Sequence, residues 1–168
     1  MDEFSDELKS FLETTASEIG SSLWRIQAEQ LLNEKSEELN RFFSLALDLL
    51  CIADMNGYFR RLNSAWESTL GYKISELVGQ KFLDFVHPDD LQQTVNALAE
   101  LREDKPILNF VNRYRHKDGS YRWIEWRSSP YLGKYIYAAA RDITETKKIT
   151  DELRADEERL ESLLRISH

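Results

Sequence analysis

Apolar and polar residues in the first part of the chain repeat with the period of an α-helix. The apolar positions are separated by alternating gaps of four and three residues, which is a heptad spacing. They are Leu12, Ala16, Ile19, Leu23 and Ile26. Two heptads are fewer than a coiled coil usually needs, so a coiled-coil helix and a helix packed on its own domain are equally good interpretations.

The same spacing returns near the end of the chain. Its positions are Ile149, Leu153, Asp156, Leu160 and Leu163, with one acid among the apolar residues. Just before them, Asp142-Ile143-Thr144-Glu145 has the spacing of a capping box, in which two side chains satisfy the first free amides of a helix. The sequence therefore predicts that a last strand passes into a helix without a flexible break.

Between these helices the pattern is that of strands and turns. Two runs rich in aromatic and branched residues, within Phe110–Trp126, flank Asp118-Gly119, a pair that favours a hairpin turn. A second hairpin is predicted over residues 49–62, around Asn56-Gly57. A further strand is expected over residues 134–144.

Short helices are expected between the two hairpins. Ser64-Ala65-Trp66-Glu67 has capping-box spacing, and Gly71 is suited to end the helix that follows. At His87-Pro88-Asp89-Asp90 the proline suits the first helical position, and the aspartates face the positive end of the helix dipole. The apolar face of the longer helix after it consists of Leu91, Val95, Leu98 and Leu101.

This order of elements predicts an α+β fold. Its centre is a five-stranded antiparallel sheet with short helices on one face, and helices of coiled-coil type flank it at both ends. We expect three parts: an N-terminal helix over residues 1–40, the sheet domain over residues 41–144 and a C-terminal helix over residues 145–168.

Alternation along the third strand indicates which face of the sheet lies inside. Phe110, Asn112 and Tyr114 share one face, whereas the other face carries Arg113 and Arg115 and is too charged to fill a core. We therefore expect the first face to point inward.

Composition and charge argue against several classes of function. A net charge of −8, from 30 acidic and 22 basic residues, disfavours nucleic-acid binding and direct membrane contact, since both depend on Lys and Arg. The single cysteine, Cys51, excludes an internal disulfide and suits a reducing compartment, so we expect a cytoplasmic location. The sequence has neither a Gly-rich phosphate loop nor a nucleophile elbow, which argues against an enzyme.

Nine short motifs follow one another from the first predicted hairpin to the last strand. They are Asp54-Met55-Asn56-Gly57, Leu62-Asn63-Ser64-Ala65-Trp66, Leu70-Gly71-Tyr72, Glu76-Leu77-Val78-Gly79, His87-Pro88-Asp89-Asp90, Asn112-Arg113-Tyr114-Arg115, Lys117-Asp118-Gly119-Ser120, Arg122-Trp123 and Asp142-Ile143-Thr144. In this order they resemble a PAS domain with its C-terminal PAC portion. Val111 departs from the family, which often has Glu there, so any salt bridge made by that Glu is absent here.

This resemblance implies a noncatalytic sensor module of bacterial signal transduction, as in the histidine kinases of two-component systems or in cyclic-dinucleotide enzymes. The first forty residues also resemble the last helix of a GAF domain followed by a signalling helix. On this interpretation, residues 145–168 form an output helix.

In the PAS family the sheet and helices enclose a cavity, and the family's topology implies the side chains that line it. They are Cys51, Ala53, Trp66, Phe110, Asn112, Tyr114, Ile124, Trp126, Ser128, Ala138 and Ala140. An apolar pocket with a few polar groups is the general form of a small-molecule site. The large aromatic side chains can also fill this space themselves, and dense packing favours that alternative.

Residue types argue against the cofactors that are common in the family. A haem sensor needs an axial histidine on the long helix, yet residues 91–104 contain none, and His87 is predicted to cap that helix. A light-sensing flavin domain needs a reactive cysteine in a helix, whereas Cys51 lies on the predicted first strand. We expect no cofactor, with noncovalent flavin as the alternative.

The resemblance and the two heptad seams together predict how the module works. A homodimer is expected through Leu12, Ile19, Leu23, Ile26, Leu160 and Leu163. Transmission from sheet to output helix is expected through Asp142, Ile143, Thr144, Ile149, Leu153 and Asp156. The signal would come from a preceding domain or a small ligand and pass to a downstream output domain. The alternatives are a flavin- or haem-loaded sensor and a structural spacer.

Two further contacts are predicted at the outer face of the sheet. Apolar residues there, which include Val111, Trp123, Tyr137 and Ala139, indicate an interface. A charge pair between Asp142 and an arginine, either Arg113 or Arg127, would join the sheet to the output helix.

Overall fold

A computed structural model describes residues 3–166, so the ends of the two predicted terminal helices, 1–2 and 167–168, lie outside the described part. The chain divides into two compact units, residues 1–42 and 43–168. The first consists of one long helix, α1 (Glu3–Leu45), whose last residues belong to the second unit. The helix thus ends at Leu45 rather than at residue 40.

Helix α1 exposes apolar side chains on more than one side. The predicted seam residues Leu12, Ile19, Leu23 and Ile26 are all exposed, and so is Trp24, which lies outside the seam. Exposed apolar side chains in such number are typical of a surface that another chain or domain covers. The heptad seam is therefore available for packing, but it is not the helix's only apolar surface.

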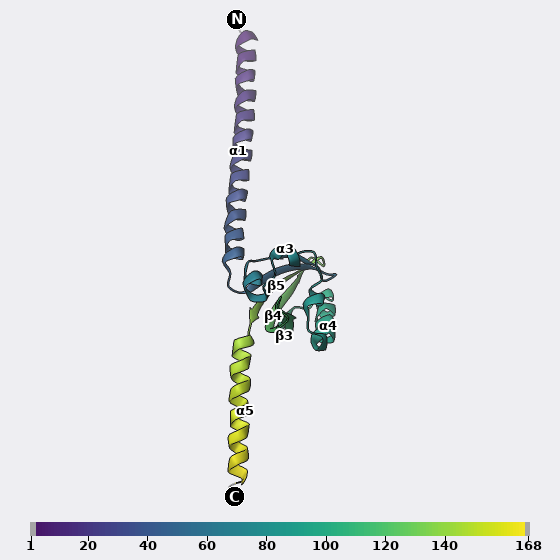
Figure 1. The fold of residues 1–168 in the computed structure, drawn as a ribbon. Helices are drawn as coiled ribbons and strands as arrows, with labels where there is room; N and C mark the ends of the chain where they lie inside the picture. Colours follow the sequence, from purple (N-terminus) through teal and green to yellow (C-terminus); the bar gives the residue numbers. More distant parts are fainter. Residues whose placement is uncertain (1–2, 167–168) are drawn as a thin grey trace. The chain divides into compact units, whose positions relative to one another are not determined.

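Five strands form one antiparallel sheet in the second unit (Figure 1). The strand order is β2-β1-β5-β4-β3, with β1 (Leu49–Asp54), β2 (Phe59–Leu62), β3 (Ile107–Arg115), β4 (Tyr121–Tyr131) and β5 (Tyr135–Asp142). The predicted α+β fold and both predicted hairpins are confirmed.

Both predicted turns depend on an aspartate and a glycine. In the first, Asp54 Oδ1 accepts hydrogen bonds from the amides of Asn56 and Tyr58, and Gly57 has a φ of 86°. In the second, Asp118 Oδ1 accepts from the Ser120 amide, and Gly119 has a φ of 89°. Positive φ is costly for residues with a Cβ, which explains the glycines.

Short helices connect the two hairpins. They are α2 (Ala65–Leu70), α3 (Ile74–Leu77), the 3₁₀ turns η1 (Phe82–Phe85) and η2 (Pro88–Asp90), and α4 (Leu91–Arg102). Gly71 ends α2 with a φ of 77°, as predicted. The predicted capping box at Ser64 is wrong, because the Ser64 hydroxyl donates to the Ser44 carbonyl and the Glu67 carboxylate accepts from the Ile74 amide.

The buried face of α4 differs from the predicted one. Leu98 and Leu101 are buried, but Leu91 and Val95 are 39% and 40% exposed, and Thr94 is buried in their place. Thr94 is a polar residue and its hydroxyl donates to the Asp90 carbonyl, so a pattern of apolar residues alone does not reveal it.

Two clusters of buried apolar side chains fill the space between the sheet and its helices. The larger contains Phe59, Trp66 and Trp126, and the smaller joins Leu98 and Leu101 of α4 to the sheet. After β5 the chain forms helix α5 (Thr144–Ile166), which has no buried residue. Within residues 3–166, no helix has both the length and the apolar composition that crossing a membrane requires.

Candidate functional site

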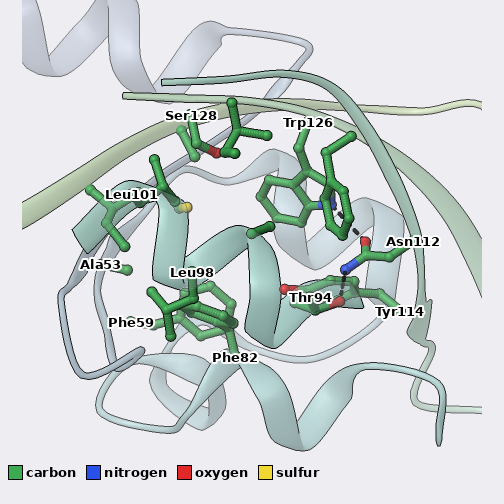
Figure 2. Close-up of a pocket in the computed structure, with 16 residues that line it drawn as sticks. Ala53, Phe59, Phe82, Thr94, Leu98, Leu101, Asn112, Tyr114, Trp126 and Ser128 are labelled. Carbon is green, nitrogen blue, oxygen red and sulfur yellow. Dashed lines mark hydrogen bonds between the residues drawn. The ribbon is translucent and has the colours of Figure 1, made fainter. Parts of the chain in front are cut away.

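A cavity of about 60 Å³ lies in the second unit, where strands, α4 and η1 meet (Figure 2). It adjoins both apolar clusters, and its lining is mostly aromatic and aliphatic. The sixteen lining residues are Cys51, Ala53, Phe59, Phe82, Thr94, Ala97, Leu98, Leu101, Ile107, Phe110, Asn112, Tyr114, Trp126, Ser128, Ile136 and Ala138.

The cavity exists because small residues lie side by side on three neighbouring strands. Ala138 of β5 pairs directly with Cys51 of β1 on one side and with Ser128 of β4 on the other. This row of small side chains across the sheet leaves space that Leu98 and Leu101 of α4 do not fill.

Most of the predicted pocket residues do line this cavity, but three do not. Trp66, Ile124 and Ala140 are buried in the larger apolar cluster and are absent from the lining. Trp66 packs against the rings of Phe59 and Trp126, at centroid distances of 5.0 and 5.9 Å. Aromatic side chains thus fill most of the interior, and a small cavity is left.

The structure adds lining residues that the sequence argument missed. Thr94, Ala97, Leu98 and Leu101 come from α4, and Ile107 comes from the start of β3. Leu98 and Leu101 were predicted to lie on the apolar face of the helix. Thr94 and Ala97 are polar or small, so a search for large apolar residues does not find them.

A chain of hydrogen bonds begins at the cavity wall (Figure 2). The indole N–H of Trp126 donates to Asn112 Oδ1 at 2.7 Å, and Asn112 Nδ2 donates to the Thr94 hydroxyl at 3.0 Å. That hydroxyl donates to the Asp90 backbone carbonyl at 2.8 Å. The buried Asn112 amide therefore joins β3 to β4 and to α4.

Asp90 continues this chain to the outer face of the sheet. Its buried carboxylate accepts hydrogen bonds from Arg113 Nε and Nη2, at 2.8 and 2.6 Å, and from the Arg113 amide at 2.8 Å. The hydrogen bond from the Arg113 side chain holds the pKa of Asp90 below its ordinary value. The Arg113 guanidinium in turn lies over the Trp123 ring, 5.0 Å from its centroid.

Trp123 of β4 contacts the start of α5. Its amide donates to Thr144 Oγ1 at 2.9 Å, its carbonyl accepts from the Ile143 amide at 2.8 Å, and Lys147 Nζ lies 4.5 Å from its ring. The Asp142 carboxylate accepts from the Thr144 amide and hydroxyl. Sheet and helix are thus joined through backbone and side chain.

Two predicted contacts in this region are wrong. Asp142 does not form an ion pair with Arg113, because Arg113 is held by Asp90, nor with Arg127. The predicted capping box is replaced by the Asp142–Thr144 turn, and the Glu145 carboxylate makes no hydrogen bond within residues 3–166. His87 does cap its turn as predicted, since its Nδ1 accepts from the Asp89 amide.

Comparisons with known proteins identify the fold. The family model described as the PAS fold matches residues 59–137. The PAS domain of an HTR-like protein from Haloarcula marismortui superposes with a TM-score of 0.61 and is 26% identical, covering 70% of this chain and 98% of that one. This chain contains a PAS domain.

Similar sequences occur within longer proteins. Sporulation kinase C of Bacillus subtilis is 29% identical over 131 residues, and White collar 1 protein of Neurospora crassa is 27% identical over 121 residues. These matches cover 74% and 71% of this chain but only 30% and 9% of the relatives. The PAS domain is itself a noncatalytic sensory module, and it corresponds to a small part of these relatives.

Two ionisable side chains that line the PAS cavity have raised pKa values. Burial raises the pKa of the Cys51 thiol to about 12, and burial together with the nearby Cys51 raises the pKa of the Tyr114 hydroxyl well above its ordinary value. Within residues 3–166, neither the Tyr114 hydroxyl nor the Ser128 hydroxyl has a hydrogen-bond partner, although Tyr114 is only 2% exposed. Both hydroxyls are therefore free to bind a ligand.

The cavity is small compared with the cofactors that PAS domains can hold. A cavity of about 150 Å³ takes benzene, so about 60 Å³ does not fit a flavin ring system or a haem. Within the described residues, no group of three or more His, Cys, Asp or Glu is placed to hold a metal ion.

Proposed function

We propose that this PAS domain is a sensory and dimerisation module that converts a change at its cavity into a change at the start of α5. The observation that carries the proposal is the unbroken series of contacts from Trp126 to Asn112, Thr94 and Asp90, and on through Arg113 to Trp123. Each step is a short hydrogen bond or a cation–π contact, so a shift at one end alters the packing at the other.

The route has a defined beginning and end. It begins at Trp126 and Asn112, which line the cavity, and it ends at Trp123, which holds the first turn of α5. Packed interiors switch between discrete arrangements rather than deforming continuously, because their side chains are close-packed. A ligand, or a preceding domain, would favour one of these arrangements and so position the output helix.

Dimerisation is part of the same proposal. Ile149, Leu153, Leu160 and Leu163 of α5 are exposed, and so is the seam of α1. A second copy of the chain would cover these apolar seams in a parallel coiled coil. Two α5 helices held side by side would then transmit a rotation or a shift to whatever domain follows.

Amide hydrogen exchange at the start of α5 tests the relay. In Asn112→Ala the hydrogen bonds to Trp126 and Thr94 are lost, and we expect the amides of Trp123, Ile143 and Lys147 to exchange about tenfold faster. In an Arg113→Gln background, the same Asn112→Ala change should no longer alter exchange at these amides, because the route is already interrupted.

A core variant outside the route is the matched control. Leu77 of α3 is fully buried, and Leu77→Ala should lower the free energy of unfolding by about 2–5 kcal/mol while removing none of the hydrogen bonds of the route. If Leu77→Ala speeds exchange at the α5 amides as much as Asn112→Ala does, exchange reports only global stability. The relay would then be rejected in favour of a structural spacer.

A further inference from the structure

We propose that the cavity binds a neutral organic molecule of about three to five non-hydrogen atoms with one hydrogen-bonding oxygen, of the class of short-chain alcohols and ketones. This inference rests on the proposed sensory function, since it names the ligand class of the same cavity.

Size sets the number of atoms. A single water molecule needs about 10–15 Å³ of such volume, and benzene with its six carbons occupies a cavity of about 150 Å³. The volume of about 60 Å³ lies between these values and corresponds to a molecule of about three to five non-hydrogen atoms. The mostly apolar lining favours a carbon skeleton over a cluster of waters.

The absence of charge in the lining sets the ligand's charge. None of the sixteen lining residues is Asp, Glu, Lys, Arg or His. Burial keeps the Cys51 thiol and the Tyr114 hydroxyl protonated, so neither supplies a counter-charge. An ionised ligand would lose its hydration with no partner in return, which costs several kcal/mol. A neutral ligand avoids this cost.

Two hydroxyls set the ligand's polar group. Tyr114 and Ser128 line the cavity, and within residues 3–166 neither hydroxyl makes a hydrogen bond. Tyr114 is only 2% exposed and Ser128 is half-buried, and a ligand oxygen would supply the hydrogen bond that each hydroxyl lacks within the described residues. Asn112 is not free in the same way, since its amide already bridges Trp126 and Thr94.

The start of β3 supplies an entrance. A surface groove between α4 and β3 shares Ala97, Ile107 and Phe110 with the cavity lining. At this point the pairing of β3 with β4 shifts register, and Asn109 has a φ of 58°. The irregular backbone interrupts the ladder here, and Phe110, which lines both the cavity and the groove, is only partly buried.

Nuclear magnetic resonance titration of the full chain tests the ligand class. The probes are 2-propanol and acetone, with acetate as an anion of nearly the same shape and cyclohexanol as an oversized alcohol. We expect the two neutral small probes to shift the indole N–H signal of Trp126 saturably, with millimolar dissociation constants. The indole signal of Trp24, which is 75% exposed on α1, should not saturate.

Variants identify the cavity as the site of these shifts. Tyr114→Phe removes one hydroxyl while keeping the ring, and should weaken 2-propanol binding about threefold to tenfold. Ala138→Val fills part of the cavity from β5 and should abolish binding. If Ala138→Val does not fold, Ser128→Val fills the cavity from β4 and should have the same effect. Ala139→Val adds the same volume to the neighbouring residue, which pairs in the sheet but does not line the cavity, and should bind like the unmodified chain.

Three results would overturn the inference. They are the absence of a saturable Trp126 shift with either neutral probe, acetate binding as tight as that of acetone, and equal effects of Ala138→Val and Ala139→Val. The hydrogen-exchange experiment uses no ligand, so loss of the α5 response there rejects the relay, whereas these three results reject only the ligand class.

Discussion

Asp90 joins the hydrogen bonds at the cavity to the outer face of the sheet. Its carboxylate receives three hydrogen bonds from Arg113, and its backbone carbonyl receives the Thr94 hydroxyl that connects to Asn112. Its side chain is only 7% exposed. A buried carboxylate is stable in the fold only when it is paired, because its lost hydration must be replaced.

The Asp90–Arg113 pair predicts a dependence of stability on pH. The folded pKa of Asp90 lies below its ordinary value, so the unfolded chain binds the proton more readily. The stabilisation is complete above the unfolded pKa of about 3.9 and is lost as pH falls through the lower folded pKa. We expect the free energy of unfolding of Asp90→Asn, measured in urea between about pH 2 and 5, to fall less steeply with acid than that of the unmodified chain.

The neighbouring aspartate is the control for this prediction. The Asp89 side chain is 77% exposed, so Asp89→Asn should keep the slope of the unmodified chain. Other carboxylates with lowered pKa, such as Asp54 and Asp118, contribute to the slope in every variant and cancel in the comparison. Identical slopes for Asp90→Asn and the unmodified chain would show that Arg113 does not stabilise the charged form.

At the scale of elements, glycines with positive φ end the short helices. Helix α2 ends at Gly71 with a φ of 77°, and Gly79 follows α3 with a φ of 83°. Both glycines adopt the left-handed conformation, which costs other residues about 1–2 kcal/mol. They differ in surroundings: a Cβ on Gly71 would lie 2.9 Å from His116 Cε1, whereas a Cβ on Gly79 would meet nothing within 4 Å.

Comparing alanine substitutions at the two glycines distinguishes the cost of backbone strain from the cost of a steric clash. We expect Gly79→Ala to lower the free energy of unfolding by about 1 kcal/mol and Gly71→Ala by about 2–3 kcal/mol, measured by chemical denaturation. The extra loss arises because His116 cannot shift freely, since its Nδ1 accepts from the Asp118 amide. Equal losses for the two variants would mean that the close approach of Gly71 to His116 in the β3–β4 loop does not affect the free energy of unfolding.

At the scale of the whole molecule, α1 and α5 both expose the apolar residues of their heptad spacing. The α5 seam contains Asp156 between Leu153 and Leu160, and α5 buries none of its residues within one chain. A polar residue in a coiled-coil seam lowers the stability of the coil. A sensor that must switch between registers needs a coil of limited stability.

Sedimentation equilibrium tests the role of Asp156. If the chain dimerises through this seam, Asp156→Leu should lower the dimer dissociation constant at least tenfold, because an apolar residue replaces a buried charge. Glu157→Leu adds the same side chain one residue outside the seam and should leave the constant nearly unchanged. A dissociation constant that Asp156→Leu does not alter would reject the coiled-coil seam.

Much of the fold was readable from the sequence because it follows from local rules. The hairpins depend on Asn56-Gly57 and Asp118-Gly119, the inward face of β3 on alternation, and the end of α2 on Gly71. Two predicted contacts failed because a residue distant in the sequence bound the side chain instead. Ser64 donates to Ser44 instead of capping α2, and Arg113 pairs with Asp90 instead of Asp142.

The sequence by itself thus determined the elements, their order and the faces of the strands, because turn residues and alternation act over a few positions. Only the tertiary structure decided the cavity and its route to α5. The cavity depends on the register that places Cys51, Ala138 and Ser128 in one row, and on the rotation of α4 that buries Thr94. Strand register and the rotation of α4 are set by packing across the whole core, so a pattern of neighbouring residues in the sequence does not predict them.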